Sequence, residues 1–273
     1  MADTKEAVKL PKFAIKKAAQ MGSPKSILLY GPPKKGKTVF ASSISAVPGY
    51  ERVLLIDVEG GSSSVNAWYP NIDVIETPTA REFSKVVEAL LNNEIVEAES
   101  GLPYQVVIID TLDKAQERQL ELYAADPKSE KDGYFKWAAL KTWTSKMADY
   151  LHMAPFLTIF VAHQDDEKDD KTGVVTTTVM LSGKSRFTFP STPDIIGHFT
   201  VITVEEDGKK GPRRAVDFTV SDKLISGQRY ADKLNGKFLD PTMEKIFQKI
   251  EPERFAKAET STNTSDTSTK KDK

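Results

Sequence analysis

The segment that most constrains the fold of this chain is residues 31–38, with the sequence GPPKKGKT. It follows a short apolar run at residues 26–30 and precedes an apolar-rich segment at residues 39–44, so it is expected to connect a buried strand to a helix. A phosphate group needs a loop of free backbone N–H groups that opens directly into a helix N-terminus, and the spacing G-x-x-x-x-G-K-[ST] supplies one. The alternative, a glycine–proline turn followed by solvated lysines, does not explain why strand, loop and helix occur in this order.

Each residue type in this loop has an expected task. The two glycines let the backbone wrap closely around an anion, Lys37 places its ammonium against the β- and γ-phosphates, and the Thr38 hydroxyl is a ligand of Mg²⁺. We therefore expect ATP and Mg²⁺ as cofactors. The residues expected to contact the nucleotide are Gly31, Pro32, Pro33, Lys34, Lys35, Gly36, Lys37, Thr38 and Val39.

The composition narrows the remaining possibilities. Among 273 residues, 39% are hydrophobic and 28% are charged, which is typical of a soluble globular protein. The 38 Lys and Arg residues are balanced by 39 Asp and Glu residues, so any nucleic-acid surface must be a local patch. The chain has no cysteine, and its three histidines lack metal-ligand spacing. Since it shows neither an apolar signal core nor an apolar run near the ~20 residues of a membrane helix, we expect a cytoplasmic protein without a membrane partner.

Apolar runs that alternate with amphipathic segments predict an α/β fold with a mostly parallel central sheet flanked by helices. The helix after Thr79 is expected to begin with a capping box formed with Glu82. A hairpin of residues 198–205 and 213–220, joined at Asp207-Gly208, adds antiparallel edge strands. The other expected strands are residues 26–30, 52–57, 72–76, 105–110, 155–162 and 174–181, and the helices follow residues 37, 79, 111, 135 and 240.

The chain is expected to hold one domain with two flanking segments. Residues 1–24 are a basic lead-in with a short strand near Phe13, and residues 25–255 form the phosphate-binding domain. Residues 256–273 are expected to be a disordered tail rich in Ser, Thr and Lys, because no apolar residue occurs from position 259 onward. Within the domain, residues 126–133 and 165–173 are highly charged and are expected to be exposed loops.

Several polar residues directly follow predicted strands. Ligands of parallel sheets bind at the carboxyl ends of the strands, so these residues are expected to converge on one crevice if their strands are neighbours. The residues are Gly31, Asp57, Glu59, Asp110, His163 and Gln164.

Two of these carboxylates fit the chemistry of a bound triphosphate. Asp110 follows a run of four apolar residues and is expected to orient Mg²⁺ or its water, although it could instead cap the helix that begins near Thr111. Glu59 is the candidate base that orients or deprotonates water, since Thr111, the residue after Asp110, cannot be a base. The alternative for Glu59 is a solvated side chain in a glycine-rich turn.

The order of these motifs resembles that of the RecA-like P-loop ATPases over about residues 24–220. The matching segments are GPPKKGKT (31–38), LLIDVEGG (54–61), VVIIDT (106–111) and IFVAHQ (159–164). Within that family the chain is most similar to the phage-encoded RecA-type single-strand annealing ATPases. The resemblance implies that Glu59 activates water and that Gln164, with His163 beside it, senses the γ-phosphate.

The resemblance also implies partners. Single-stranded DNA would bind through residues 128–136 and 165–173, although both segments carry as many acids as bases. Tyr134, Phe135 and Trp137 are either stacking surfaces for bases or part of the core. Members of the family form homo-oligomers, in which Lys184 and Arg186 would reach the phosphates of a neighbouring subunit; the alternative is solvated loop charges. A single-strand-binding protein or another recombination protein is a further expected partner.

Two other functions remain open at this point. A small P-loop phosphotransferase would need an arginine-rich lid, and residues 128–136 contain no arginine. A binding module whose nucleotide acts as a conformational switch would bind ATP tightly and hydrolyse it negligibly.

Overall fold

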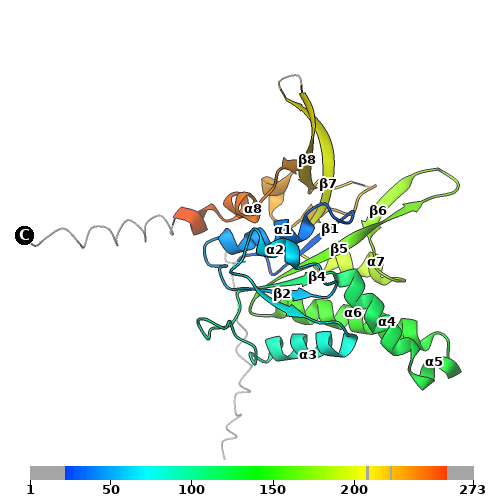
Figure 1. The fold of residues 1–273 in the computed structure, drawn as a ribbon. Coiled ribbons are helices and arrows are strands. Elements are labelled where there is room, and N and C mark those ends of the chain that lie inside the picture. Colours follow the sequence, from blue (N-terminus) through cyan, green and yellow to red (C-terminus); the bar gives the residue numbers. More distant parts are fainter. Residues whose placement is uncertain (1–21, 207–208, 222, 257–273) are drawn as a thin grey trace, which may run out of the picture.

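The computed structural model describes residues 22–206, 209–221 and 223–256. These residues form one ten-stranded sheet with helices on both faces (Figure 1). The strands are β1 (Ser26–Gly31), β2 (Val53–Asp57), β3 (Asp73–Glu76), β4 (Val106–Asp110), β5 (Leu157–Lys168), β6 (Val175–Val179), β7 (Ile195–Glu206), β8 (Lys209–Asp217), β9 (Gly227–Gln228) and β10 (Lys237–Leu239).

The helices cover the sheet in two groups. Figure 1 shows α1 and α8 on one side of the central strands and α3, α4 and α6 on the other. The helices are α1 (Lys37–Ser42), α2 (Ser63–Asn66), α3 (Ala80–Leu91), α4 (Leu112–Ala124), α5 (Pro127–Lys131), α6 (Phe135–Met153), α7 (Ser185–Thr188) and α8 (Met243–Ile250), with short 3₁₀ turns η2 (Ser43–Ala46), η3 (Phe189–Ser191) and η4 (Ala231–Leu234).

The sheet is mostly parallel. Its order is β10-β8-β7-β1-β5-β4-β2-β3, and the run from β7 to β3 is parallel throughout. β8 and β10 continue one edge in antiparallel sense, while β6 pairs with β5 and β9 pairs with β7, also antiparallel. This arrangement confirms the predicted fold class. It also places β5 between β1 and β4, so that the end of β5 lies between the loop at residues 31–38 and Asp110.

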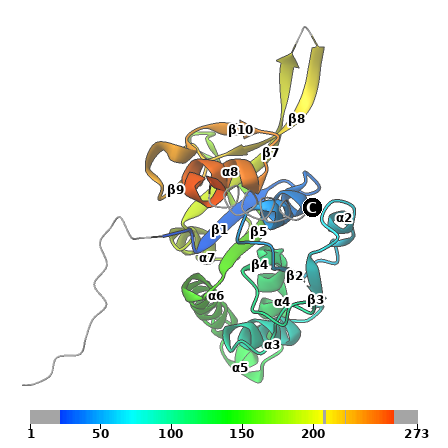
Figure 2. The same cartoon turned by 90° about the vertical axis from the view of Figure 1, so that its left-hand side faces the viewer.

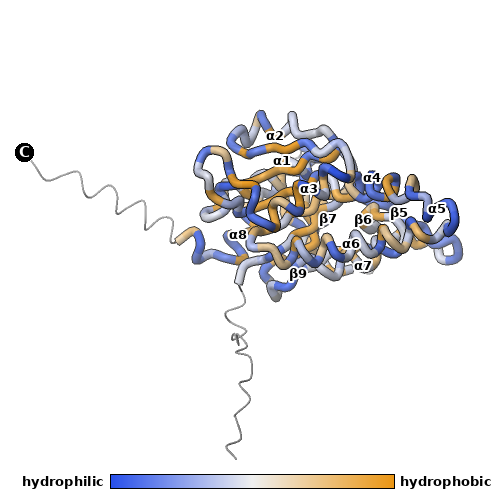
Figure 3. Tube along the Cα trace, turned by 90° about the horizontal axis from the view of Figure 1, so that it is seen from below, coloured by the Kyte–Doolittle hydropathy of each residue, from blue (hydrophilic) through white to orange (hydrophobic). Residues whose placement is uncertain are grey.

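The central strands are continuous apolar runs because helices bury both of their faces. Every residue of β1, β2 and β4 is buried, whereas β3 at the sheet edge alternates between partly buried and exposed residues. Side chains alternate along each strand, so Ile27 and Leu29 face the core under α1 and α8, while Leu28 and Tyr30 face the core under α3, α4 and α6. Figure 3 shows the resulting contrast between the hydrophobic α1 and the hydrophilic α5.

The expected capping box at α3 is present in modified form. The Thr79 hydroxyl accepts a hydrogen bond from the Glu82 backbone N–H (3.2 Å) and donates one to Glu82 Oε2 (2.6 Å). A donor that would otherwise lack a partner in the first turn is therefore satisfied. The apolar face predicted for this helix packs on the sheet, with Phe83, Val87 and Leu90 buried.

The structure corrects both predicted loops. Residues 165–168 are part of β5, because β6 pairs with them from Asp165↔Thr178 to Lys168↔Val175 and Thr177 donates to Asp166. Charged residues are compatible with a strand there because the strand extends beyond the covered core into water. In the segment 126–133, Asp126 caps the short helix α5, which buries none of its residues. That segment is exposed, as predicted, but helical.

The predicted hairpin is present, but its second strand begins earlier than expected, at Lys209, and ends at Asp217 rather than at residue 220. β7 and β8 pair from His198↔Asp217 to Glu206↔Lys209 and project away from the body of the molecule in both views (Figures 1 and 2). The predicted turn at Asp207-Gly208, the lead-in strand near Phe13 and residues 257–273 lie outside the described residues. Within the described ranges, no helix has both the length and the apolar character that crossing a bilayer requires.

Candidate active site

A cavity of about 700 Å³ opens at the carboxyl ends of β1, β5, β4 and β2. The register of the parallel strands explains it, because Gly31 pairs with His163 and Asp57 pairs with Asp110. We call it the strand-end cavity. Its lining includes Lys37, Thr38, Glu59, Asp110, His163 and Arg214. Of the six residues predicted to converge, Glu59, Asp110 and His163 line this cavity, whereas Gly31, Asp57 and Gln164 do not.

Lys37 is held inside the loop that precedes α1. Its Nζ donates to the carbonyl oxygens of Gly31 (3.0 Å) and Pro32 (2.8 Å), and the residue is only 5% exposed. Burial lowers the pKa of this ammonium, and the nearby charges of Asp110, Asp113 and Glu59 oppose the effect. An ammonium has three donors, so one is left for a phosphate oxygen.

The two glycines of the loop are required for different reasons. A Cβ on Gly31 would lie 2.0 Å from the carbonyl oxygen of Phe199, so only glycine lets β7 pass this close to β1. Gly36 has a φ of 98°, a left-handed conformation that side chains disfavour. The glycine pattern that identifies the loop in the sequence thus follows from its backbone geometry.

Thr38 and Asp110 form a direct contact, in which Thr38 Oγ1 donates to Asp110 Oδ2 at 2.7 Å. Burial raises the pKa of Asp110 to about 6; the bond from Thr38 opposes this, and the charges of Glu59 and Asp57 add to it. A hydroxyl and a carboxylate side by side are oxygen ligands of the kind that Mg²⁺ takes. A divalent cation would also compensate the buried carboxylate. These two residues therefore fit Mg²⁺, and the described residues contain no group of three His, Asp or Glu that would hold a metal alone.

Asp57 has a structural task that the sequence did not reveal. Its Oδ1 accepts from the backbone N–H groups of Glu59 (3.1 Å), Gly60 (2.6 Å) and Gly61 (3.2 Å), and its Oδ2 accepts from Ser62 (2.8 Å). Burial alone would raise the pKa of Asp57, but these hydrogen bonds outweigh it and lower the pKa. Asp57 thus fixes the turn that carries Glu59 to the rim of the strand-end cavity. Among the described residues, the Glu59 carboxylate has no hydrogen-bond or ion-pair partner.

His163 is held by Asp113, a residue whose role the sequence motifs did not indicate. Asp113 Oδ1 accepts the His163 backbone N–H and Oδ2 bonds the ring Nδ1, both at 2.9 Å. The bond from Asp113 raises the pKa of His163, although burial and the Lys37 charge oppose the shift. The sequence does contain a hint of this role, because Asp113 lies in the first turn of the helix that follows Asp110.

The other predicted site residues lie away from the lining of the strand-end cavity. Gln164 points to the other side of β5, where its side chain bonds His198 Nε2 and Asp166 Oδ2, both at 2.9 Å. Arg186, in α7, pairs with Glu167 (3.3 Å) and Asp165 (3.7 Å) on β5. Lys184 is exposed just before α7.

Arg214 lines the strand-end cavity and was also missed. Its guanidinium carbon would be 3.2 Å from a Cβ on Gly36, so it lies against the loop of residues 31–38. The neighbouring Arg213 points to the other face of β8 and pairs with Glu206 (2.8 Å) and Asp240. The sequence shows both arginines, but the face of the strand that each occupies depends on a hairpin register that it does not determine.

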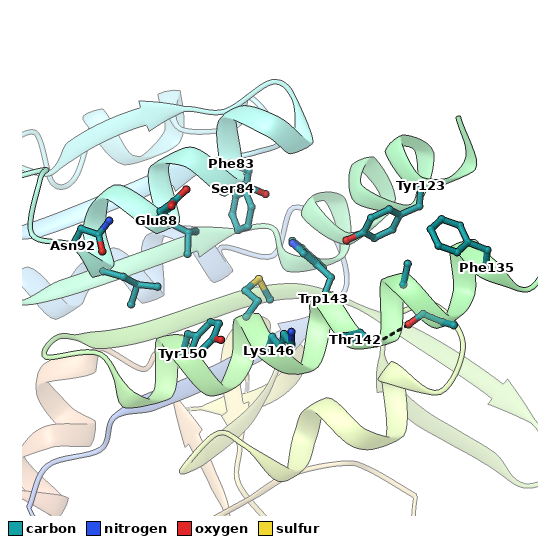
Figure 4. Close-up of a pocket in the computed structure, with 15 residues that line it drawn as sticks. Phe83, Ser84, Glu88, Asn92, Tyr123, Phe135, Thr142, Trp143, Lys146 and Tyr150 are labelled. Atoms are coloured by element: carbon teal, nitrogen blue, oxygen red, sulfur yellow. Dashed lines mark hydrogen bonds between the residues drawn. The ribbon is translucent and has the colours of Figure 1, made fainter. Parts of the chain in front are cut away.

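A second large hollow shares no lining residue with the strand-end cavity. This groove, of about 720 Å³, lies between α3, α4 and α6, and Figure 4 shows Phe83, Trp143, Tyr123 and Tyr150 around it. Its lining is mostly apolar and includes neither a glycine-rich loop nor two facing carboxylates. The groove does not have the groups that a triphosphate requires.

Comparison with known proteins agrees with the geometry. A family model described as AAA domain matches residues 23–230, more than half of the 273-residue chain. No curated protein matches the chain. The phosphate loop before α1, the Thr38–Asp110 contact and this match lead to one conclusion: the chain belongs to the AAA-domain family of P-loop ATPases.

Proposed function

We propose that this ATPase hydrolyses ATP in a Mg²⁺-dependent reaction at the strand-end cavity and acts on single-stranded DNA, in the manner of phage-encoded RecA-type recombination and annealing proteins. The observation that carries the first half is the meeting of Lys37, the Thr38–Asp110 pair and Glu59 in one cavity. Bound Mg²⁺ would supply positive charge to the β- and γ-phosphates.

Glu59 is the residue that we assign to water activation. Its backbone is fixed by Asp57, while its carboxylate is exposed to the strand-end cavity and has no partner among the described residues. A positioned base needs such freedom, since it has to accept a proton from water during attack on the γ-phosphate. Lys37 would hold the β- and γ-phosphates in place through the donor that the loop carbonyls leave available.

We assign the sensing of the γ-phosphate to His163, with Gln164 as a residue that acts after it. His163 lines the strand-end cavity, and its contact with Asp113 favours the cationic ring, which would attract phosphate charge. Gln164 would first have to leave His198 and Asp166. Such a movement of Gln164 would transmit the state of the nucleotide to the other side of β5.

Exposed aromatic residues support the proposal of single-stranded DNA. Tyr134 is 84% exposed and Trp137 is 44% exposed at the start of α6, and Lys136 Nζ lies 5.6 Å from the Trp137 ring centre. Bases stack on such rings without sequence preference, and nearby lysines attract the phosphate backbone. Figure 1 shows the α5 end and the β5–β6 hairpin projecting toward the same side of the view.

The homo-oligomer expected for such proteins is part of the same proposal. Lys184 is exposed and free to reach a neighbouring subunit, whereas Arg186 would have to leave Asp165 and Glu167. A single-strand-binding or other recombination protein is the further partner that we propose. Particle size, measured with and without ATP and oligonucleotide, tests the assembly.

The test of the DNA proposal is the ATPase rate with and without Mg²⁺ and with and without a single-stranded oligonucleotide, at two salt concentrations. We expect DNA to raise the rate and salt to reduce this effect steeply. Tyr134→Ala should weaken DNA binding by roughly 5- to 100-fold, the equivalent of one lost stacking contact. Tyr150→Ala, which removes an exposed tyrosine from the other end of α6, is the matched control and should have no effect. A rate that is independent of DNA would contradict the proposal.

A further inference from the structure

One threonine in the wall of the strand-end cavity has a hydroxyl without a partner. Thr111 directly follows Asp110, lines the strand-end cavity and is only 2% exposed. Its Oγ1 is buried and makes no hydrogen bond to any of the described residues. A buried hydroxyl is costly to leave unpaired, and one without a protein partner is commonly satisfied by water or by a ligand. A polar molecule that enters the cavity would remove this cost.

The backbone of Thr111 does not explain why the hydroxyl is unpaired. Thr79, Thr111 and Thr242 are the N-cap residues of α3, α4 and α8, and all three have extended backbones, with φ of −130°, −116° and −127°. The hydroxyls of Thr79 and Thr242 accept a backbone N–H of the first turn, at 3.2 and 3.3 Å. The hydroxyl of Thr111 does not. Since capping is the usual role of threonine at this position, the Thr111 hydroxyl is available for another contact.

The fold brings Thr111 close to Glu59, the residue assigned to water activation. Strands β2 and β4 pair as far as Asp57 and Asp110, and the Val58 N–H then donates to the Asp110 carbonyl oxygen at 2.7 Å. Glu59 and Thr111 are the next residues on the two sides of this hydrogen bond, and both line the strand-end cavity. Two adjacent strand ends therefore carry a carboxylate that accepts a proton and a hydroxyl that has no other partner.

The hydroxyl of Thr111 is better suited to a water molecule than to the cation. Thr38 already supplies a hydroxyl to Asp110 Oδ2, whereas Thr111 makes no hydrogen bond to that carboxylate. A water that attacks phosphorus has to be held in one direction, and a single hydrogen bond to a base leaves it free to rotate. A second hydrogen bond from the neighbouring strand end would fix it.

We propose that the Thr111 hydroxyl holds the attacking water together with Glu59. This inference rests on the proposed function, because it concerns the same hydrolysis. One proton of the water points to the Glu59 carboxylate and the other to Thr111 Oγ1, which leaves an oxygen lone pair for the γ-phosphorus. The hydroxyl and methyl groups of threonine exchange places by rotation about a single bond, so the hydroxyl is able to follow the water.

The step balances without a further reactant. As the bond from the water oxygen to the γ-phosphorus forms, the bond from that phosphorus to the β–γ bridging oxygen breaks, and ADP leaves with the electron pair. Glu59 takes one proton of the water. The other proton stays on the phosphate product, and Thr111 neither gains nor loses one.

The test uses Thr111→Val, which replaces the hydroxyl by a methyl group of similar size. Turnover should fall by roughly 5- to 150-fold, the effect of one lost hydrogen bond, and the ATP affinity measured by calorimetry should stay unchanged. Thr111→Ser keeps the hydroxyl and should restore most of the turnover. Thr178→Val is the matched control, because Thr178 is equally buried, also has an unpaired hydroxyl and does not line the strand-end cavity.

Two further measurements distinguish a contact with the water from a structural role. ADP with Mg²⁺ and aluminium fluoride imitates the phosphoryl group during transfer, so Thr111→Val should bind it more weakly by a factor similar to the loss of turnover. In the double variant Glu59→Gln/Thr111→Val, the loss of turnover should be smaller than the product of the two single losses, because both residues act on one water.

The outcomes separate this inference from the proposed function. Turnover at the wild-type rate in Thr111→Val, an equal loss in Thr111→Ser, or independent losses in the double variant would overturn the role of the hydroxyl and leave ATP hydrolysis at the strand-end cavity intact. Absence of ATP hydrolysis by the wild-type protein would overturn both. Thermal melting curves check folding, and Thr111→Ala, which also lacks the hydroxyl, replaces Thr111→Val if the latter is unfolded.

Discussion

The strand-end cavity and the helical groove have nearly the same volume, about 700 and 720 Å³, but opposite linings. In the strand-end cavity, burial lowers the pKa of Lys37 and raises that of Asp110, and the hydrogen bond with Asp113 raises the pKa of His163. The groove is lined mainly by aromatic and aliphatic side chains of α3, α4 and α6. The size and the apolar character of a hollow therefore do not identify the active site of this molecule. The active site is identified by several charged groups that are held out of water at one edge of the sheet.

The difference follows from how the two hollows are built. The strand-end cavity is formed where buried parallel strands stop, so their terminal polar residues have to face one another. The groove is formed by the flanks of helices whose other faces already cover the sheet, with Phe83 and Met147 buried and Trp143 partly buried. The first arrangement concentrates charge, whereas the second leaves apolar surface.

The largest expected effect on ligand binding comes from Lys37 in the strand-end cavity. Lys37→Ala should weaken ATP binding by roughly 10- to 150-fold, since it removes a charge-assisted hydrogen bond to phosphate. Lys146→Ala, in the groove, is the matched control and should leave binding unchanged. Calorimetry measures both affinities, and melting curves check that both variants fold. A larger loss of ATP affinity in Lys146→Ala than in Lys37→Ala would indicate that the groove, not the strand-end cavity, binds the nucleotide.

A smaller effect is expected at the Thr38–Asp110 contact. Asp110→Asn keeps the hydrogen bond from Thr38 but removes the carboxylate charge, so Mg²⁺ should bind the protein–nucleotide complex roughly 10- to 100-fold more weakly. A titration of the ATPase rate with Mg²⁺ gives this affinity. If the half-saturating Mg²⁺ concentration stays unchanged, Asp110 does not hold the cation.

The smallest expected effect is on stability and concerns His163 and Asp113. The folded-state pKa of His163 is raised, so this pair stabilises the fold fully below the unfolded pKa of 6.5 and loses that contribution as pH rises through the folded pKa. With solvent screening, Asp113→Asn should lower the melting temperature by about 1 to 4 °C at pH 6. The difference should shrink at pH 8.5. A difference that grows with pH would show that His163 is not the charged partner.

Most of the fold could be predicted because its central strands are short apolar runs that end in polar residues. The sheet class, the helix after Thr79 and the β7–β8 hairpin all followed from local patterns. The extension of β5 to Lys168 could not be predicted from a local pattern. The charged residues 165–168 show no apolar alternation and become a strand only by pairing with β6. Such pairing is a tertiary effect that local propensity does not contain.

Site residues could be predicted where they directly follow an apolar strand in the sequence. They could not be predicted where the register of the sheet determines which side chains face the cavity. Lys37, Thr38, Glu59, Asp110 and His163 meet as expected because they follow neighbouring strands. Arg214 and Trp68 come from distant segments that only the folded chain brings to Gly36. Whether His163 or Gln164 faces the strand-end cavity depends on the alternation of side chains along β5, which the motif alone does not reveal.

The assignment of Glu59 to water activation is tested most directly by measuring ATP binding and ATP hydrolysis in Glu59→Gln beside the wild-type protein, with Glu88→Gln in the groove as the control. We predict unchanged ATP affinity in both variants and turnover about 10²- to 10⁴-fold slower in Glu59→Gln alone. Turnover at the wild-type rate in Glu59→Gln would show that Glu59 is not the base.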